Sequence, residues 1–377
     1  MSEANLKCNF KKWRLCIIAG GKLLNLVLAF VMSVSVLCTP ALAVNSRFTA
    51  IVDQPKISEE HVPDASRKNG DDLVGEIRRF ISDIVVPFGN DYTINGCDEV
   101  QLGMAIPTYI MEENFNSQSY YNIAEVQYYP VFSEENVIGL VGVAQDGAGD
   151  YVFSYSEGYS EQVNSVLADN AQIALIGDGR SLKAVASSEQ VTGIRSETSG
   201  VNPAEELSTI SITGNAEEAS RSSRAGNLAV STKFQSDNWD CWAACVACIG
   251  QYYTGINKSS IQVADAVGIH TYASAGQTRD AIQSVYHVST TYYEGSLSVS
   301  GVMDTISNDR KPILAGVVFS GYIGHMVVIN GWTVVGTSPA LSFMDPAAGP
   351  TMATLSTSYP IMIPLGGNMY TMQEYII

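Results

Sequence analysis

A polar stretch near the middle of this 377-residue chain constrains its fold most, because it separates two parts that have enough apolar residues to fold. Residues 191–232 are rich in Ser, Thr, Glu, Asn and Gly and contain almost no aromatic side chains. Such a composition buries too little apolar surface to offset the conformational entropy lost on folding. We therefore predict a flexible linker at 191–232, between one domain at 44–190 and a second domain at 233–377.

The first 43 residues have the three parts of a secretory signal peptide. Basic residues between positions 7 and 14 precede an apolar run over 23–37, and an A-x-A pattern of small residues ends at Ala43. The run is shorter than the roughly 20 residues that a bilayer-spanning helix needs, and it contains Asn25. We expect cleavage after Ala43, secretion of the chain, and membrane contact only through this segment before it is removed.

The charge of the chain argues against polyanionic partners. The formal net charge is −17, and no basic stripe follows the sequence. Proteins that bind nucleic acids place Lys and Arg where they neutralise phosphates, so we expect no nucleic-acid partner. An acidic surface is also repelled by anionic membranes.

Three of the cysteines that would remain after signal cleavage are crowded together. Cys241, Cys245 and Cys248 are four and three residues apart, the spacing of one helix face, whereas Cys97 stands alone. The second pair of ligands that a structural zinc site needs is missing, so no metal is expected. Cys245 and Cys248 are interpreted as buried helix residues, with a bridge from one of them to another cysteine left open as an alternative.

Hydrophobic periodicity predicts an α+β fold for both domains. In the first domain, a helix over 72–84 and strands over 120–132, 137–144 and 151–155 indicate a small antiparallel sheet. A helix over 158–168 and short strands over 172–176 and 182–186 follow. In the second domain, helices come first and strands later. The predicted helices are 241–253, 259–267, 278–286 and 299–307, and the predicted strands are 313–319, 325–332, 340–344 and 370–376.

Cys241 is the cysteine best placed to react. It is the first residue of the predicted helix 241–253, where unpaired N–H groups and the helix dipole favour a thiolate over a thiol. Asn238 and Asp240 are candidate caps for this helix. Cys245 and Cys248 lie one and two turns further in, where the effect of the dipole has faded.

A thiolate nucleophile needs a base, and His325 is the strongest candidate for it. His325 begins an apolar strand in the segment Gly324-His-Met-Val-Val-Ile-Asn-Gly-Trp332. Asp345 ends the next predicted strand, so pairing of the two strands would bring its carboxylate to the imidazole. Such a carboxylate fixes the imidazole tautomer and stabilises the imidazolium. Asp345 is followed by Pro346, so the alternative that it only initiates a turn stays open.

These motifs resemble the papain-like cysteine peptidases, in particular the secreted bacterial, staphopain-like members. Gln235 precedes Cys241-Trp-Ala by six positions, a Gly-His-x-Val motif carries His325, and Asp345 follows on the next strand. The resemblance implies a papain-like α+β domain, with Cys241 as nucleophile, His325 as base, Asp345 as orienting residue and Gln235 in the oxyanion hole. It also implies polypeptide substrates, no cofactor, and an N-terminal propeptide that inhibits the enzyme until it is removed.

Two positions depart from the family pattern. Asp345 stands where Asn is more common, and Asp240 stands where many members have a small residue. A carboxylate beside the thiol opposes its ionisation unless it points away. The linker contains Arg221-Ser-Ser-Arg224, which we interpret as a processing site between propeptide and mature enzyme.

Two other functions remain open at this point. The same triad serves amidases and transpeptidases, which transfer an acyl group through the same thioester chemistry. A degenerate peptidase scaffold in a secreted binding protein would instead leave Cys241 as an ordinary buried residue.

Overall fold

The computed structural model describes residues 70–88, 92–113, 119–169, 172–178, 180–186, 202–212, 223–319, 323–335, 337–355 and 360–377. The predicted signal peptide at 1–43 lies outside these residues, as does Arg221 of the predicted processing site. Within the described ranges, none of the helices combines the length and the apolar character needed to cross a bilayer. Residues 63–377 form one compact unit, which contains the second predicted domain and most of the first. We call residues 70–212 its N-terminal part and residues 223–377 its C-terminal part.

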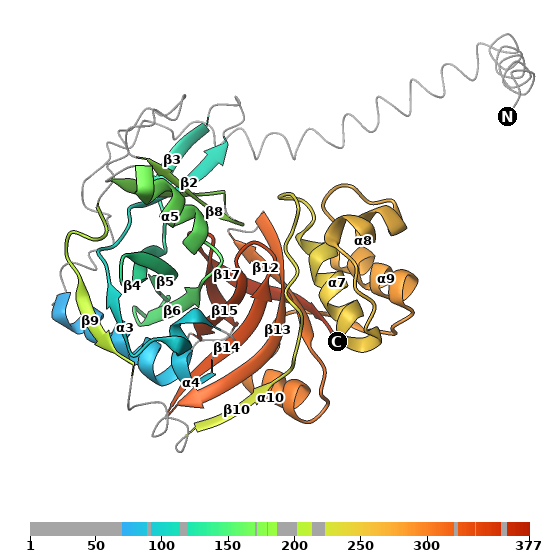
Figure 1. Ribbon diagram of the computed structural model, residues 1–377. Coiled ribbons are helices and arrows are strands. Elements are labelled where there is room, and N and C mark those ends of the chain that lie inside the picture. The colour runs from blue at the N-terminus through green and yellow to red at the C-terminus, as the bar shows by residue number, and fades with distance from the viewer. Residues whose placement is uncertain are drawn as a thin grey trace, which may run out of the picture. The chain divides into compact units, whose positions relative to one another are not determined.

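The N-terminal part mixes helices with short strands (Figure 1). Its elements are helix α3 (Gly70–Phe80), the π-helical turn η2 (Ile81–Val85), the short α4 (Val86–Phe88), the 3-10 turn η3 (Thr93–Gly96), strands β1 (Glu99–Leu102), β2 (Thr108–Glu113), β3 (Ser119–Ile123), β4 (Gln127–Ser133), β5 (Asn136–Gln145) and β6 (Tyr151–Ser156), helix α5 (Ser160–Asp169), and strands β7 (Ile173–Gly177), β8 (Leu182–Ala186) and β9 (Ser208–Ser211).

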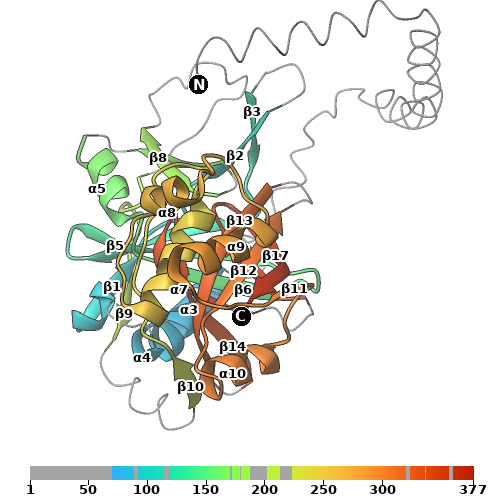
Figure 2. The same ribbon diagram turned by 90° about the vertical axis from the view of Figure 1, so that its right-hand side faces the viewer.

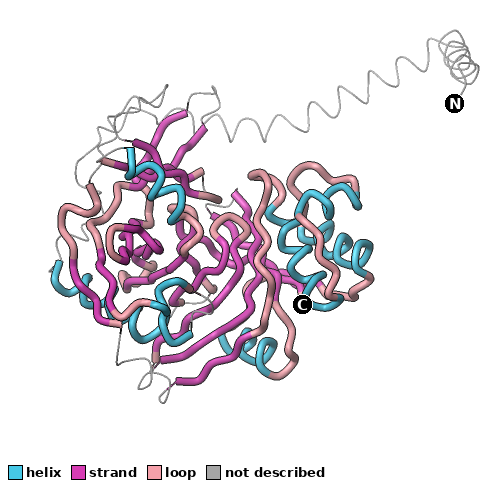
Figure 3. Tube along the Cα trace, in the orientation of Figure 1, coloured by secondary structure: helices cyan, strands magenta, loops and turns pink. Residues whose placement is uncertain are grey.

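The C-terminal part has helices first and strands later, as predicted. Its elements are strand β10 (Ser223–Asn227), helices α7 (Cys241–Thr254), α8 (Ser260–Val267) and α9 (Ala275–Tyr286), strand β11 (Tyr292–Glu294), helix α10 (Val299–Ser307), and strands β12 (Ile313–Phe319), β13 (Ile323–Val335), β14 (Ser338–Asp345), β15 (Gly349–Thr354), β16 (Met362–Leu365) and β17 (Asn368–Ile376). Figure 3 shows α7, α8 and α9 gathered on one side of these strands.

One sheet runs through both parts. Among the described residues it has 13 strands, and its main path is β11-β17-β12-β13-β14-β15-β6-β5-β4-β1-β9. The junction is the antiparallel pair β15–β6, in which Met352 lies opposite Tyr155. The sequence predicted a separate small sheet for the first domain. That expectation was wrong, because β4, β5 and β6 belong to the 13-stranded sheet. Strand pairing is non-local, and no local pattern in β6 or β15 indicates that the two strands pair.

Strand alternation divides the C-terminal core into two layers. Met326 and Val328 of β13 pack against α7 and α9, while Val327 and Ile329 point to the opposite face and pack against α10. Successive side chains in a strand point to opposite faces, so an uninterrupted apolar run marks a strand that is covered on both sides. Figure 2 views the molecule from the helical side, with α7 and α9 in front of β12, β13 and β17.

Several predicted boundaries change for identifiable reasons. The predicted strand 120–132 is two strands, β3 and β4, because the backbone N–H of Val126 leaves the ladder and donates to the Gly367 carbonyl. The predicted linker 191–232 contains two described strands: β9 pairs with β1, and β10 pairs with β13. The remaining sheet, β3-β2-β7-β8, contains the parallel pair β2–β7 and is therefore mixed rather than purely antiparallel.

Candidate active site

Helix α7 places Cys241 at its first turn. Its N-cap, Asp240, leaves the helical conformation at φ −103° and ψ 19°, and the Asp240 carbonyl accepts the first helical N–H groups, from Ala243 and Ala244. The helix ends at Gly255, whose positive φ of 72° suits a residue without a β-carbon. The predicted span 241–253 is thus confirmed to within one residue, and the Cys241 thiol lies at the positive end of the helix dipole.

The Asp240 carboxylate points away from the thiol and into the preceding loop. It accepts the backbone N–H groups of Ser236 at 3.0 and 3.1 Å and of Asp237 at 2.9 Å, and the residue is fully buried. It makes no side-chain capping bond to α7, so the predicted cap by this side chain was wrong. Asn238 does not cap the helix either, because its amide donates to Asp178 instead. The acidic residue before Cys241 therefore holds the loop that carries Gln235.

The structure brings His325 and Asp345 together as the predicted strand pairing requires. Strands β13 and β14 pair with Val328 opposite Met344, so continuing the register places Asp345 two residues along from His325 on the same face. The distance from His325 Nε2 to Asp345 Oδ1 is 2.7 Å, and both residues are buried. A carboxylate only accepts, so Nε2 carries the proton and donates it.

This tautomer leaves Nδ1 of His325 without a proton and free to accept one. Among the described residues, Nδ1 has no hydrogen bond of ordinary geometry. The thiol is nevertheless close enough for a hydrogen bond and a charge interaction between the two groups to shift both pKa values. Such contacts are often loose in the free enzyme and tighten when substrate binds.

The two pKa values shift in opposite directions. Burial alone would raise the pKa of the Cys241 thiol. The hydrogen bond and charge of His325, a backbone hydrogen bond from Met326 and the charge of Arg180 outweigh the effect of burial, so the pKa is lowered. Burial lowers the pKa of His325, but the charge and hydrogen bond of Asp345, with the contribution of Cys241, raise it to about 10. The pair therefore favours a thiolate beside an imidazolium.

The other two cysteines of α7 have the opposite character. Burial raises the pKa of Cys248 to about 12 and that of Cys245 well above its ordinary value. The Cys245 thiol lies 3.2 Å from the Met326 carbonyl, and the Cys248 thiol lies 3.2 Å from the Ser231 carbonyl. All four cysteines in the described ranges carry free thiols. Of the three on this helix, only Cys241 has a lowered pKa.

Gln235 lies beside the Asp345 turn. Its backbone N–H donates to the carbonyl of Pro346 at 2.9 Å, so the loop before α7 is fixed to the residue that follows Asp345. The Oε1 atom of Gln235 is buried and accepts no hydrogen bond within the described part of the chain. The structure thus fixes the Gln235 backbone beside the turn that follows Asp345 and leaves the Oε1 atom without a hydrogen-bond partner in the described residues.

Trp242 fixes a neighbouring loop to the catalytic helix. Its indole N–H donates to the carbonyl of Thr271 at 3.0 Å, and its side chain is buried. The adjacent Tyr272 is 56% exposed. Nothing in the local sequence indicates this contact between Trp242 and the loop that carries Tyr272.

The turn between β7 and β8 reaches the catalytic residues from the N-terminal part. Asp178 accepts the Asn238 amide at 2.7 Å, and Arg180 donates from Nε to the Gly324 carbonyl at 3.0 Å. Asn238 precedes Cys241 by three residues, and Gly324 directly precedes His325. The turn therefore contacts both segments that carry the predicted nucleophile and the predicted base. No motif at 178–181 indicated this role.

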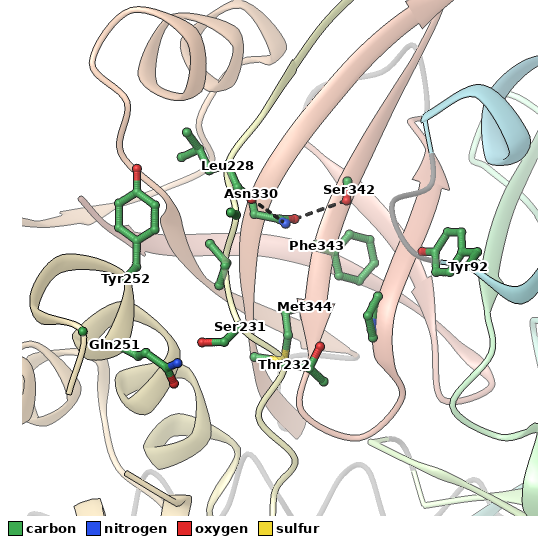
Figure 4. Close-up of a pocket in the computed structure, with 14 residues that line it drawn as sticks. Tyr92, Leu228, Ser231, Thr232, Gln251, Tyr252, Asn330, Ser342, Phe343 and Met344 are labelled. Atoms are coloured by element: carbon green, nitrogen blue, oxygen red, sulfur yellow. Dashed lines mark hydrogen bonds between the residues drawn. The ribbon is translucent and has the colours of Figure 1, made fainter. Parts of the chain in front are cut away.

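A cavity of about 750 Å³ lies elsewhere in the C-terminal part. Figure 4 draws its lining, in which Ser231 and Thr232 of one segment face Gln251 and Tyr252 of α7 and residues of β13 and β14. Cys241, Gln235, His325 and Asp345 do not line it. Within the described ranges, no group of His, Cys, Asp or Glu side chains is placed to hold a metal ion.

Comparison with known proteins agrees with this geometry. Residues 222–360 match the model of a family described as the papain-like cysteine protease AvrRpt2. The matched segment spans Cys241, His325 and Asp345, and an α+β arrangement with a mostly antiparallel sheet fits such a domain. No curated protein matches the chain. Residues 222–360 are thus similar to papain-like cysteine proteases, and this match supports a cysteine peptidase domain in the C-terminal part of the chain.

Proposed function

We propose that the chain is a secreted cysteine endopeptidase made as a zymogen, with Cys241, His325, Asp345 and Gln235 as its catalytic residues. One observation carries the proposal. The buried imidazole of His325 is fixed by Asp345 at 2.7 Å, and it lowers the pKa of the Cys241 thiol at the start of α7. A Cys241 thiolate beside a His325 imidazolium is the ion pair that a thiol peptidase needs before its substrate binds.

The chemistry is acyl transfer through a thioester. The Cys241 thiolate attacks the carbonyl carbon of a peptide, and the negative charge moves to the carbonyl oxygen. The backbone N–H of Cys241 and the side-chain N–H of Gln235 stabilise this oxyanion. As the tetrahedral species collapses, His325 gives its Nδ1 proton to the leaving amine, and the acyl group stays on sulphur.

Deacylation reverses the proton transfer. Neutral His325 takes a proton from water through Nδ1, and the resulting hydroxide adds to the thioester carbon. Collapse releases the carboxylic acid and restores the thiolate beside the imidazolium. Throughout both steps, Asp345 keeps Nε2 protonated and stabilises the imidazolium, so it acts through His325.

Burial of the catalytic pair supports the zymogen part of the proposal. Cys241 is 5% exposed and His325 is 1% exposed. This exposure is too small for a polypeptide to reach the Cys241 sulphur or the His325 ring. The turn 178–181 binds on both sides of the pair, through Asn238 and Gly324. We assign the inhibitory role to the N-terminal part, with the turn as its blocking element. Secretion rests on the signal-like residues 1–43.

The test is casein hydrolysis by the purified full-length chain, with intact mass recorded over time. Wild type is expected to lose its N-terminal region and then cut casein, while Cys241→Ala does neither. A Cys245→Ser variant is the matched control on the same helix and is expected to behave like wild type. Equal casein hydrolysis by wild type and Cys241→Ala would overturn the proposal. Full activity of the intact, uncut chain would overturn its zymogen part alone.

A further inference from the structure

The side chain of Arg180 occupies a site built by the C-terminal part next to the catalytic pair. Its guanidinium carbon lies 4.5 Å from the centre of the Tyr272 ring, its Nη1 donates to Tyr272 Oη at 3.0 Å, and its Nε donates to the Gly324 carbonyl at 3.0 Å. The guanidinium thus meets an aromatic face and two neutral oxygen acceptors, which together suit a cation with several N–H donors.

Both components of this site are fixed by the peptidase itself. Gly324 belongs to β13 and directly precedes His325, and its carbonyl is held in place by the strand. Tyr272 follows Thr271, whose carbonyl accepts the indole N–H of Trp242 at 3.0 Å. Trp242 in turn is the neighbour of Cys241. The site therefore persists in the peptidase when the turn 178–181 moves away.

The position of the site suits a substrate side chain. Gly324 directly precedes His325, and Tyr272 lies in the loop held by Trp242, the neighbour of Cys241, so both groups are next to the segments that a peptide at the Cys241 sulphur would contact. Arg180 is close enough to Cys241 for its positive charge to favour the thiolate. A basic residue of a substrate in the same place would be held by the same aromatic face and acceptors.

We propose that the Tyr272 ring and the Gly324 carbonyl form a substrate subsite for an arginine or lysine side chain, which Arg180 fills before activation. This inference rests on the proposed peptidase function and adds its substrate class, which is polypeptides with a basic residue close to the cleaved bond. The predicted processing stretch, with Arg221 and Arg224, is such a polypeptide.

The test maps cleavage sites in a peptide library. Full-length chain, both wild type after activation and Arg180→Ala, is incubated with peptides from a proteome digested at acidic residues, which leaves internal Arg and Lys intact. Mass spectrometry then gives the residues around each cut that is absent with Cys241→Ala. We expect Arg and Lys to be enriched at one position by about twofold to fivefold, the range of a cation–π contact at an exposed site.

Variants of Tyr272 decide the assignment. Tyr272→Leu removes the ring face and is expected to abolish the enrichment, while Tyr272→Phe keeps the ring face and is expected to retain part of it. Tyr293→Leu is the matched control, because Tyr293 is an exposed tyrosine that stacks on Tyr375; it should keep the wild-type preference. Cuts without basic enrichment, or enrichment that survives Tyr272→Leu, would overturn the inference. Absence of any Cys241-dependent cut would instead overturn the proposed function.

Discussion

His325 and Asp345 form a buried hydrogen bond of 2.7 Å between Nε2 and Oδ1 across strands β13 and β14. The second carboxylate oxygen, Oδ2, is buried without a hydrogen-bond partner among the described residues, while Oδ1 also accepts the N–H of Ala347. The charge of Asp345 is thus directed at the imidazole. This pair explains why the pKa of His325 is raised although burial alone would lower it.

Replacing Asp345 by Asn is expected to move the alkaline limb of the pH–activity profile to lower pH. The reaction needs a protonated imidazole, so activity falls as the pH rises through the pKa of His325, which is about 10 in the present form. The carboxylate favours the charged imidazolium, and its removal returns the pKa toward the ordinary value of about 6.5. The profile of kcat/KM against pH measures this shift. An unchanged alkaline limb in Asp345→Asn would contradict the assigned role.

Alkylation is expected to be selective for Cys241 once the N-terminal part no longer covers it. At pH 7, iodoacetamide should label Cys241 at least about tenfold faster than Cys245 or Cys248, whose pKa values are raised by burial. His325→Ala should slow labelling of Cys241, because it removes the hydrogen bond and charge that stabilise the thiolate. Peptide mass spectrometry over time gives the three rates. Similar rates at all three cysteines would rule out an activated thiol.

Arg180→Ala is expected to raise the peptidase activity of the uncut precursor by about tenfold. The change removes the contact with the Tyr272 ring and two hydrogen bonds that hold the turn 178–181 in place. The measurement is hydrolysis of a quenched fluorescent peptide before any loss of intact mass. Arg279→Ala is the control, since Arg279 is a surface residue paired with its neighbour Asp280. Equal activity of wild type and Arg180→Ala precursors would mean that another element blocks the site.

Asp240→Ala is expected to lower the free energy of unfolding by about 1–3 kcal/mol, the cost of leaving buried N–H groups without an acceptor. The buried carboxylate of Asp240 accepts the N–H groups of Ser236 and Asp237 in the loop before α7. Urea unfolding followed by fluorescence measures the change. Asp237→Ala, at an exposed neighbouring position, should cost less. A larger loss for Asp237→Ala than for Asp240→Ala would show that the loop is organised differently.

Cutting the chain between residues 212 and 223 is expected to leave the two fragments associated. Strand β6 pairs with β15 across the junction, and the Phe153 N–H donates to Thr354 Oγ1 at 2.8 Å. The apolar cluster around Tyr155 also includes Met352 from the C-terminal part. Size-exclusion chromatography of nicked Cys241→Ala protein should show one peak until the N-terminal fragment is degraded or denaturant is added. Immediate separation of the fragments would show that the shared sheet contributes little to their association.

Local patterns were sufficient to predict the helix that begins at Cys241 and the strands that carry His325 and Asp345. Each follows from a periodic apolar run that ends in a turn signal. The side-chain pairing of His325 with Asp345 also followed, because consecutive antiparallel strands usually neighbour each other. These features depend on residues that are close in sequence.

Features set by distant partners were not predictable in this way. Strand β15 contains Gly349 and Pro350, which indicate a turn, yet it is held on both sides by β14 and β6. The contact of Arg180 with Tyr272 joins residues that are 92 positions apart. For β15 and for Arg180, a partner far away in the sequence decides between locally equivalent options. Asp240 was expected to cap the helix, but its carboxylate instead accepts the N–H groups of Ser236 and Asp237 in the loop before it.

The most direct test of the account is detection of the thioester on Cys241. Activated full-length protein is mixed with a nitrophenyl ester of a short acylated peptide, quenched in acid within seconds, and analysed by intact mass and by peptide mapping. The account predicts a mass increase equal to the acyl group, located on Cys241, absent in Cys241→Ala and long-lived in His325→Ala if that variant acylates. Turnover of the ester with no acyl group on Cys241, or an equal yield of product from Cys241→Ala, would contradict it.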